Sequence, residues 1–396
     1  MTTRLYYLEP YRTAFDAVVT SCETHDGRLH VALDRTVFYP TSGGQPFDTG
    51  VLGDARVLDV IDREDDVVVH VVDRPLNVGS TVTGTIDWDR RFDHMQQHTG
   101  QHVLSAAFDR LFDVRTESFH LGTAAATVDL AREVTASEVA AAESESNRVV
   151  WEDRPVSIRF ASPEEAMALP LRKEPARGGR LRLIEIDDFD LSACGGTHVA
   201  RTGAIGTIAI TGTEKFRGGS RVEFLCGGRV LSRFRLWREA FAATRQHLSV
   251  GPAELAGAVE RLQGDAKSLQ RTIRSLQEQL ASHEAKGLLA RGERLDDRLI
   301  VAEALDGWDA AGLKALAVAA TSSDPRATAA LFTTATPQLA VVARGKECSV
   351  DAAAVLKALF ARFGGKGGGK PDLAQGGGLT AKKEDLVAAA MDLLRR

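Results

Sequence analysis

The first 88 residues consist mainly of short runs of β-branched and apolar residues that are separated by polar turns. These runs lie at 17–20, 29–33, 57–61 and 67–72. Such runs are typical of strands, and the breaks at Asp26-Gly27 and Asp65-Asp66 are typical of turns. The pattern therefore predicts a small barrel or sandwich over residues 1–88.

A helical period appears after this β region. A helix is expected from about His94 to Phe112, because apolar residues recur on one of its faces. The buried stripe is expected to comprise Val103, Leu104, Ala107, Phe108, Leu111 and Phe112. Two further helices are expected, one opened by Thr135-x-x-Glu138 with capping-box spacing and one opened by Ser162-Pro163 and ended before Pro170.

Strand patterns lie between and after these helices. They are expected at 118–122, 126–130, 181–186, 205–210 and 221–225. We expect the last three to belong to one sheet. Residues 89–240 are thus predicted to form an α+β domain.

From Pro252 onward, apolar residues recur alternately four and three positions apart. They are Leu255, Val259, Leu262, Ala266, Leu269, Ile273, Leu276 and Leu280. This heptad spacing predicts a long helix within a coiled-coil linker, residues 250–295, that pairs with another helix of the same chain or of a second copy. Simple packing against the rest of the chain is the alternative.

The last region, 296–396, alternates helices (310–320, 350–363, 383–394) with short strands (331–333, 339–342) and predicts a small α/β domain. The whole chain is therefore predicted to be an α+β multidomain protein.

Glycine-rich stretches at 364–369 and 376–378 include or flank Lys366 and Lys370. Two interpretations stay open for them: a flexible linker, or a surface of backbone and lysines that binds phosphates. The spacing of a Walker loop is missing.

The composition restricts the possible classes of protein. The chain has 396 residues, 44% hydrophobic content and only four cysteines, which is too few for a disulfide framework and is typical of a reducing compartment. It lacks a long apolar stretch and an apolar signal core near Met1, so we expect a cytoplasmic protein without a membrane partner. The net charge of −5 means that any RNA binding must depend on local basic patches.

Two short motifs offer ligands for a metal. His98-x3-His102 would place two imidazoles on one helix face, one turn apart, and Cys194-Gly195-Gly196-Thr197-His198 adds a thiol and a third imidazole beside a glycine turn. One sulfur and three nitrogens form a tetrahedral set that suits zinc. The alternative is a capped helix beside an unrelated glycine-rich turn.

The order of motifs resembles that of a known family. The loop 38–46 (Phe-Tyr-Pro-Thr-Ser-Gly-Gly-Gln-Pro), the two ligand motifs and the terminal glycine-rich block together resemble the editing half of alanyl-tRNA synthetases and, most closely, the free-standing long AlaX editing proteins. The resemblance implies a small β-barrel (1–88), a zinc-dependent editing domain (89–240) and a C-terminal DHHA-type tRNA-binding domain (296–396). It implies one zinc ion per chain, held by the four ligands named above.

The activity that the resemblance implies is hydrolysis of the ester in mischarged tRNA(Ala), carrying serine or possibly glycine. A complete ligase is not expected, because fewer than a hundred residues precede His98 and their pattern is that of β structure. The alternative is a non-catalytic, zinc-containing protein that binds tRNA or self-associates. Whether zinc activates water or only positions substrate is left open.

Two groups of residues are candidates for contacts with the substrate. For the amino-acid pocket they are Thr41, Gln45, Gln101, Thr116, Ser118 and His120, because a site that accepts serine needs partners for its hydroxyl. For the tRNA they are Lys215, Arg217, Arg221, Lys366 and Lys370. A homodimer through the heptad helix or the C-terminal domain is also expected.

Overall fold

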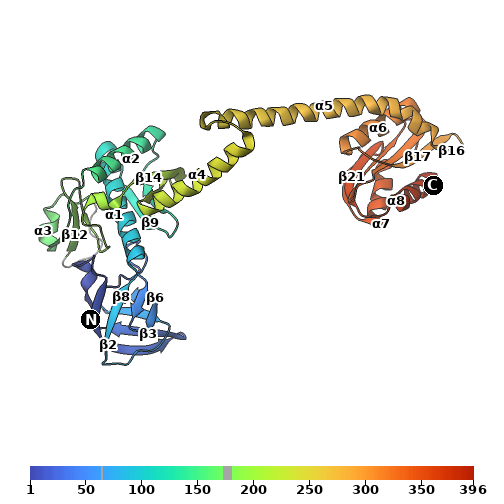
Figure 1. Cartoon of the computed structure of the whole chain (residues 1–396). Helices are drawn as coiled ribbons and strands as arrows, with labels where there is room; N and C mark the ends of the chain where they lie inside the picture. Colours follow the sequence, from blue (N-terminus) through green and yellow to red (C-terminus); the bar gives the residue numbers. More distant parts are fainter. Residues whose placement is uncertain (64–65, 173–180) are drawn as a thin grey trace. The chain divides into compact units, whose positions relative to one another are not determined.

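The computed structural model describes residues 1–63, 66–172 and 181–396 (Figure 1). The chain divides into two compact units, Met1–Ala243 and Thr244–Arg396, and each is described by itself. Among the described residues, no helix combines the length and the apolar character needed to cross a membrane.

The first unit begins with a closed six-stranded barrel, drawn in blue in Figure 1. Its strands, in the order in which they pair, are β2 (Ala14–His25), β3 (Arg28–Leu33), β7 (Val68–Val72), β6 (Ala55–Asp62), β5 (Gly50–Leu52) and β8 (Thr81–Ile86). Alternate apolar side chains such as Phe15, Val31 and Val60 fill the interior, as the period-2 pattern requires. The barrel expected from the sequence is therefore confirmed. A short parallel pair, β1 (Thr3–Arg4) with β4 (Arg35–Thr36), lies outside it.

Helix α1 (Trp88–Phe112) follows the barrel directly and begins well before the predicted start at His94. Asp87 caps the helix, because its side chain accepts a hydrogen bond from the N–H of Arg90. The segment 87–91 is mostly polar, so apolar periodicity did not reveal this start of the helix. Its middle is buried on all sides, polar residues included, whereas Leu111, predicted to be buried, is 45% exposed. A helix that buries polar groups on every face needs partners for them on several neighbouring elements.

Two sheets flank α1, and this differs from the single sheet expected for the later strands. One holds β14 (Ile208–Phe216), β15 (Gly219–Cys226), β10 (Ala126–Leu130) and β9 (Thr116–Leu121); the other holds β11 (Val156–Ala161), β12 (Leu181–Ile186) and β13 (Asp190–Ala193). Residues 202–205 form a 3-10 turn, so the strand predicted at 205–210 begins only at Ile208. Strand patterns do not reveal which strands pair, because pairing depends on long-range packing.

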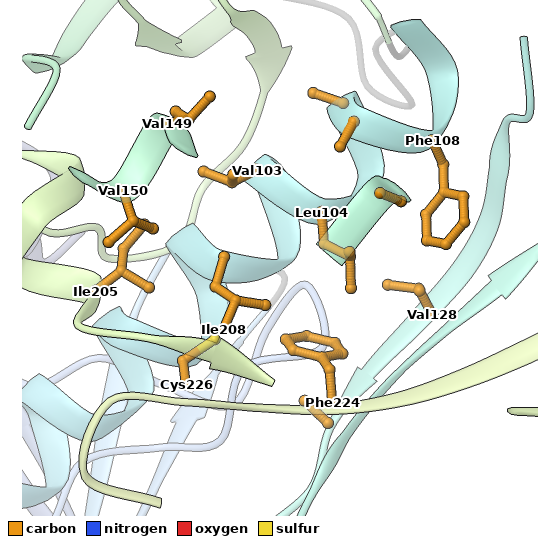
Figure 2. Packing of buried hydrophobic residues seen from close by; sticks show 14 of the residues in the cluster. Val103, Leu104, Phe108, Val128, Val149, Val150, Ile205, Ile208, Phe224 and Cys226 are labelled. Atoms are coloured by element: carbon orange, nitrogen blue, oxygen red, sulfur yellow. The ribbon is translucent and has the colours of Figure 1, made fainter. Parts of the chain in front are cut away.

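The remaining helices of this unit are α2 (Ala136–Trp151), α3 (Pro163–Met167) and α4 (Gly228–Leu248), which continues across the boundary at Thr244. Both predicted N-termini are confirmed as capping boxes, at Thr135 and at Ser162. The main core lies where α1, α2 and the four-stranded sheet meet, and Figure 2 shows Leu104 and Phe108 of α1 near Val128 and Phe224 of the sheet.

A buried ion pair joins the barrel to α1. Arg91 of α1 and Asp48, which follows the 38–46 loop, are both fully buried and pair through two nitrogens of the guanidinium. Arg91 also donates to the carbonyls of Val37 and Pro10, and Asp48 accepts the N–H of Tyr39. The loop is therefore fixed against the helix that carries His98.

The second unit contains the long helix α5 (Leu255–Ala290) and a six-stranded sheet. The sheet order is β16 (Glu293–Leu295), β17 (Arg298–Leu305), β18 (Ala327–Thr333), β19 (Gln338–Arg344), β21 (Leu373–Leu379) and β20 (Lys366–Gly369). The end of α5 and α6 (Ala310–Ser323) pack on one face. Helices α7 (Ala352–Phe363) and α8 (Lys383–Arg395) pack on the other, which gives the layered α/β domain that was expected.

The glycine-rich block is part of this sheet, so the linker interpretation is wrong. Strands β20 and β21 pair in register, and the ring of Phe360 lies directly against them. A Cβ atom at Gly367 or Gly376 would lie 2.9 or 2.5 Å from that ring. The glycines therefore allow an aromatic side chain of α7 to approach the backbone of the edge strands.

Candidate metal centre

The two sequence motifs converge at one point in the first unit. His98 and His102 lie one turn apart on α1, with ring centroids 5.4 Å apart. Cys194 and His198 come from the loop after β13. In the part of the chain that the structure describes, these four residues form a group whose ligand atoms all lie within 4.8 Å of one another. Three are buried and Cys194 is partly buried.

The imidazole of His98 is oriented by Gln45. The Oε1 atom of Gln45 accepts the backbone N–H of Thr197 at 3.0 Å and lies 2.9 Å from His98 Nδ1, while its Nε2 donates to Thr197 Oγ1 at 2.8 Å. Because the N–H of Thr197 can only donate, Oε1 is the acceptor, and Nδ1 of His98 must carry the proton. The lone pair of His98 Nε2 then points toward Cys194 Sγ, which is 3.4 Å away.

The other two imidazoles have similar support. Asp190 Oδ2 lies 3.0 Å from His102 Nδ1, and the carboxylate also accepts two hydrogen bonds from Arg172. Thr99 Oγ1 lies 3.2 Å from His198 Nδ1. Each Nδ1 atom is thus engaged outside the group, which leaves the three Nε2 atoms for a shared ligand. Such outer contacts are typical of metal-binding histidines.

The electrostatics favour the protonation states that a metal requires. Burial would raise the pKa of the Cys194 thiol, but the electrostatic influence of the neighbouring His98 and His198 rings, together with hydrogen bonding from His102, holds it well below its ordinary value. Burial lowers the pKa of His198 to about 3, so its ring is neutral. Burial would also lower the pKa of His102, yet hydrogen bonds with Asp190 and Cys194 raise it to about 9. A thiolate beside an imidazolium can exchange one proton for a divalent cation.

The loop that carries Cys194 is held closely against α1. A Cβ atom at Gly196 would lie 2.1 Å from His98 Cε1, so a side chain at this position would displace the ring. Arg182 of β12 donates to the carbonyls of Cys194 and Gly196, each at 2.8 Å. The donor set and its rigid support could therefore hold a metal ion.

A cavity of about 340 Å³ borders this centre. Two of the four candidate ligands, His102 and Cys194, form part of its wall. The other lining residues are Gly43, Gly44, Gln101, Thr116, Glu117, Ser118, Phe119, Arg172, Ser192, Ala193 and Gly195.

Comparison with known proteins identifies the family. Along its whole length the chain is 30% identical to the alanyl-tRNA editing protein AlaX-L of Pyrococcus horikoshii, and the alignment covers 99% of that protein. The chain belongs to the alanyl-tRNA editing proteins. It is also 36% identical to the editing protein Aarsd1 of Mus musculus over 72% of this chain and 70% of that one.

Other matches concern parts of the editing protein. Residues 181–223 match the threonyl and alanyl tRNA synthetase second additional domain, 296–396 match the DHHA1 domain, and 13–90 match the class II (A) tRNA synthetases. The alanine–tRNA ligase of Pyrococcus furiosus is 33% identical over 77% of this chain, which spans 35% of that ligase. The editing protein is therefore not a complete ligase.

Of the predicted pocket residues, the structure brings three to the cavity: Gln101, Thr116 and Ser118. Gln45 is fully buried behind His98 and contacts the ligand residue instead of the cavity. Thr41 and His120 are exposed and are absent from the lining.

The predicted tRNA contacts lie on two surfaces. Lys215 pairs with Glu133, Arg221 pairs with Asp129 through two nitrogens, and Arg217 lies over the ring of Phe216. These three residues lie on the β14–β15 hairpin. Lys366 and Lys370 lie exposed at the β20–β21 hairpin of the second unit.

Several supporting residues of the editing protein were not found by sequence reasoning. Asp190, Arg172, Arg182 and Thr99 act through hydrogen bonds that join distant parts of the chain. The one local signal was Asp190, which lies between the predicted strand 181–186 and Cys194, four residues before that cysteine. For Arg182 and Thr99 the sequence holds no local signal.

Proposed function

We propose that this chain hydrolyses the ester of mischarged tRNA(Ala), removing serine or glycine, and so acts in translation as an editing enzyme in trans. The observation that carries the proposal is the shared wall of the metal centre and the cavity. His102 and Cys194 belong to both. An ester that enters the cavity is thereby placed beside the ligand group.

Zinc is the metal proposed, one ion per chain, because three imidazoles and a thiolate match its preferences. When bound, it would supply Lewis-acid chemistry for an ester carbonyl or a water molecule. The chain's own residues hold the site in a fixed geometry. Gln45, Asp190 and Thr99 orient the three rings, and Arg182 fixes the loop of Cys194.

The same proposal requires contacts with the tRNA. Within the described residues Arg217 forms no ion pair, so its charge is available to phosphates, whereas Lys215 and Arg221 already have carboxylate partners. The exposed Lys366 and Lys370 provide a second basic surface in the DHHA1 domain. Because phosphate contacts release counterions, binding should weaken as salt rises.

Self-association is proposed for α5. Leu262, Leu269 and Ile273 of the heptad seam are 58%, 63% and 51% exposed. A seam of this length gains stability when it is buried against another helix, and a second copy of the chain offers an identical one. A cytoplasmic location fits the cysteine content and is also proposed.

The test is the time course of amino-acid release from seryl-, glycyl- and alanyl-tRNA(Ala). The proposed enzyme releases serine fastest and spares the alanyl ester. The alternative, a zinc-containing protein that binds tRNA without catalysis, would bind all three and release none of the amino acids above the uncatalysed rate.

A further inference from the structure

We infer that Gln101 is the residue that recognises the serine hydroxyl of the substrate. The inference rests on the proposed function and deepens it, because it names one specificity-determining atom among the residues around the cavity. That atom is Oε1 of Gln101.

Gln101 lies on α1 between the two histidine ligands and forms part of the cavity wall. The residue is only 3% exposed. Its Oε1 atom is buried and has no hydrogen-bond partner among the described residues. A buried acceptor without a partner costs about 1–3 kcal/mol, so the atom is expected to have a donor when the cavity is filled.

The orientation of the side chain is fixed from behind. Gln101 Nε2 donates to Ser105 Oγ at 2.8 Å, and Thr116 Oγ1 donates to the same oxygen at 2.7 Å. Ser105 is fully buried. With its amide nitrogen held in this way, Gln101 presents its oxygen and not its nitrogen to a ligand, so the site selects a donor.

The seryl group of the substrate carries two donors, the side-chain hydroxyl and the α-ammonium group, and the α-ammonium group is common to all three esters. A neutral amide oxygen matches the neutral hydroxyl, whereas a cationic group is matched better by a carboxylate. Glu117 lines the same cavity and, in the described part of the chain, forms no ion pair. We therefore assign the hydroxyl to Gln101. An alanyl or glycyl ester would leave Oε1 unpaired, and this makes the contact a source of discrimination.

The experiment compares kcat/KM for seryl-, glycyl- and alanyl-tRNA(Ala) in the wild type and in Gln101→Met, which keeps the length of the side chain and removes the acceptor. We expect a fall of about 10- to 100-fold for the seryl ester and less than about twofold for the other two. Ser105→Ala frees the amide of Gln101 to rotate. It should lower the ratio of kcat/KM for the seryl ester to kcat/KM for the alanyl ester by a smaller factor than Gln101→Met does. Metal content must stay at the wild-type value in both variants.

An equal fall for all three esters would overturn the inference, because the oxygen would then serve a group that all substrates share. Unchanged values would overturn it as well. Binding of the non-hydrolysable 3′-seryl-amide and 3′-alanyl-amide of adenosine gives an independent result. The wild type should bind the seryl compound about tenfold more tightly, and Gln101→Met should abolish that preference. If the wild type hydrolysed no ester, the proposed function would fail, and this binding ratio would still decide the role of Gln101.

Discussion

Gln45 provides a sharp test of the metal centre, because it contacts a ligand without touching the cavity. In Gln45→Met the side chain keeps its length but loses three buried hydrogen bonds, to His98 Nδ1 and to both the N–H and Oγ1 of Thr197. Two donors, His98 Nδ1–H and the Thr197 N–H, are left without a partner. At about 1–3 kcal/mol each, the loss is about 2–6 kcal/mol, shared between folding stability and metal binding.

Loss of an outer contact to a metal-binding histidine typically weakens metal affinity about 10- to 100-fold. We expect a loss of this size for zinc in Gln45→Met, measured by competition with a chromophoric chelator. Gln101→Met is the matched control, since it makes the same change on the cavity side, where, among the described residues, the amide is hydrogen-bonded to Ser105 and to none of the four candidate metal ligands. If Gln45→Met bound zinc as tightly as this control, the proposed orientation of His98 would be refuted.

Three further predictions concern stability and assembly. Arg91→Met leaves the buried carboxylate of Asp48 unpaired and should lower the free energy of unfolding by about 3–5 kcal/mol in urea titrations; a change below about 1 kcal/mol would contradict the role given to this pair. Burial lowers the pKa of His70 from 6.5 to about 4. Between pH 4 and pH 6.5 this histidine is therefore protonated in the unfolded chain and neutral in the folded chain. The contribution of His70 to the free energy of unfolding is then fully present above pH 6.5 and falls by about 3 kcal/mol as the pH drops to 4. In His70→Gln the slope of the free energy of unfolding against pH in this interval should decrease by the equivalent of about one bound proton. Leu269→Glu with Ile273→Glu should make a self-associating chain monomeric in sedimentation experiments while its folding is retained, and an unchanged mass would exclude the seam as the interface.

The sequence allowed prediction of those features that depend on local spacing. The closed barrel follows from period-2 runs, and the metal group follows from His98-x3-His102 and the Cys194 motif, because a helix and a tight turn fix the distances within each half. The capping boxes were found for the same reason. Each of these signals lies within a few residues of chain.

Features that depend on distant contacts could not be predicted in this way. Gln45 was predicted to contact the amino acid of the substrate. The ion pair of Asp48 with Arg91 and the hydrogen bonds with Thr197 instead hold it behind His98, and these contacts join distant parts of the chain. The strand 181–186 lies in a different sheet from the later strands because side-chain packing, and not strand propensity, selects its partners. The glycine-rich block could not be assigned to a linker or to a folded surface from its sequence, because the strands that it forms pack against the ring of Phe360 on another element.

We propose that the metal centre acts on seryl-tRNA(Ala) in the cavity beside it. The most direct measurement is the initial rate of serine release from seryl-tRNA(Ala), beside alanine release from alanyl-tRNA(Ala), for the wild type and for Cys194→Ala. We expect the wild type to release serine at least about tenfold faster than alanine, and Cys194→Ala to lose this release of serine. Equal rates for the two esters, or an unchanged rate in the variant, would contradict it.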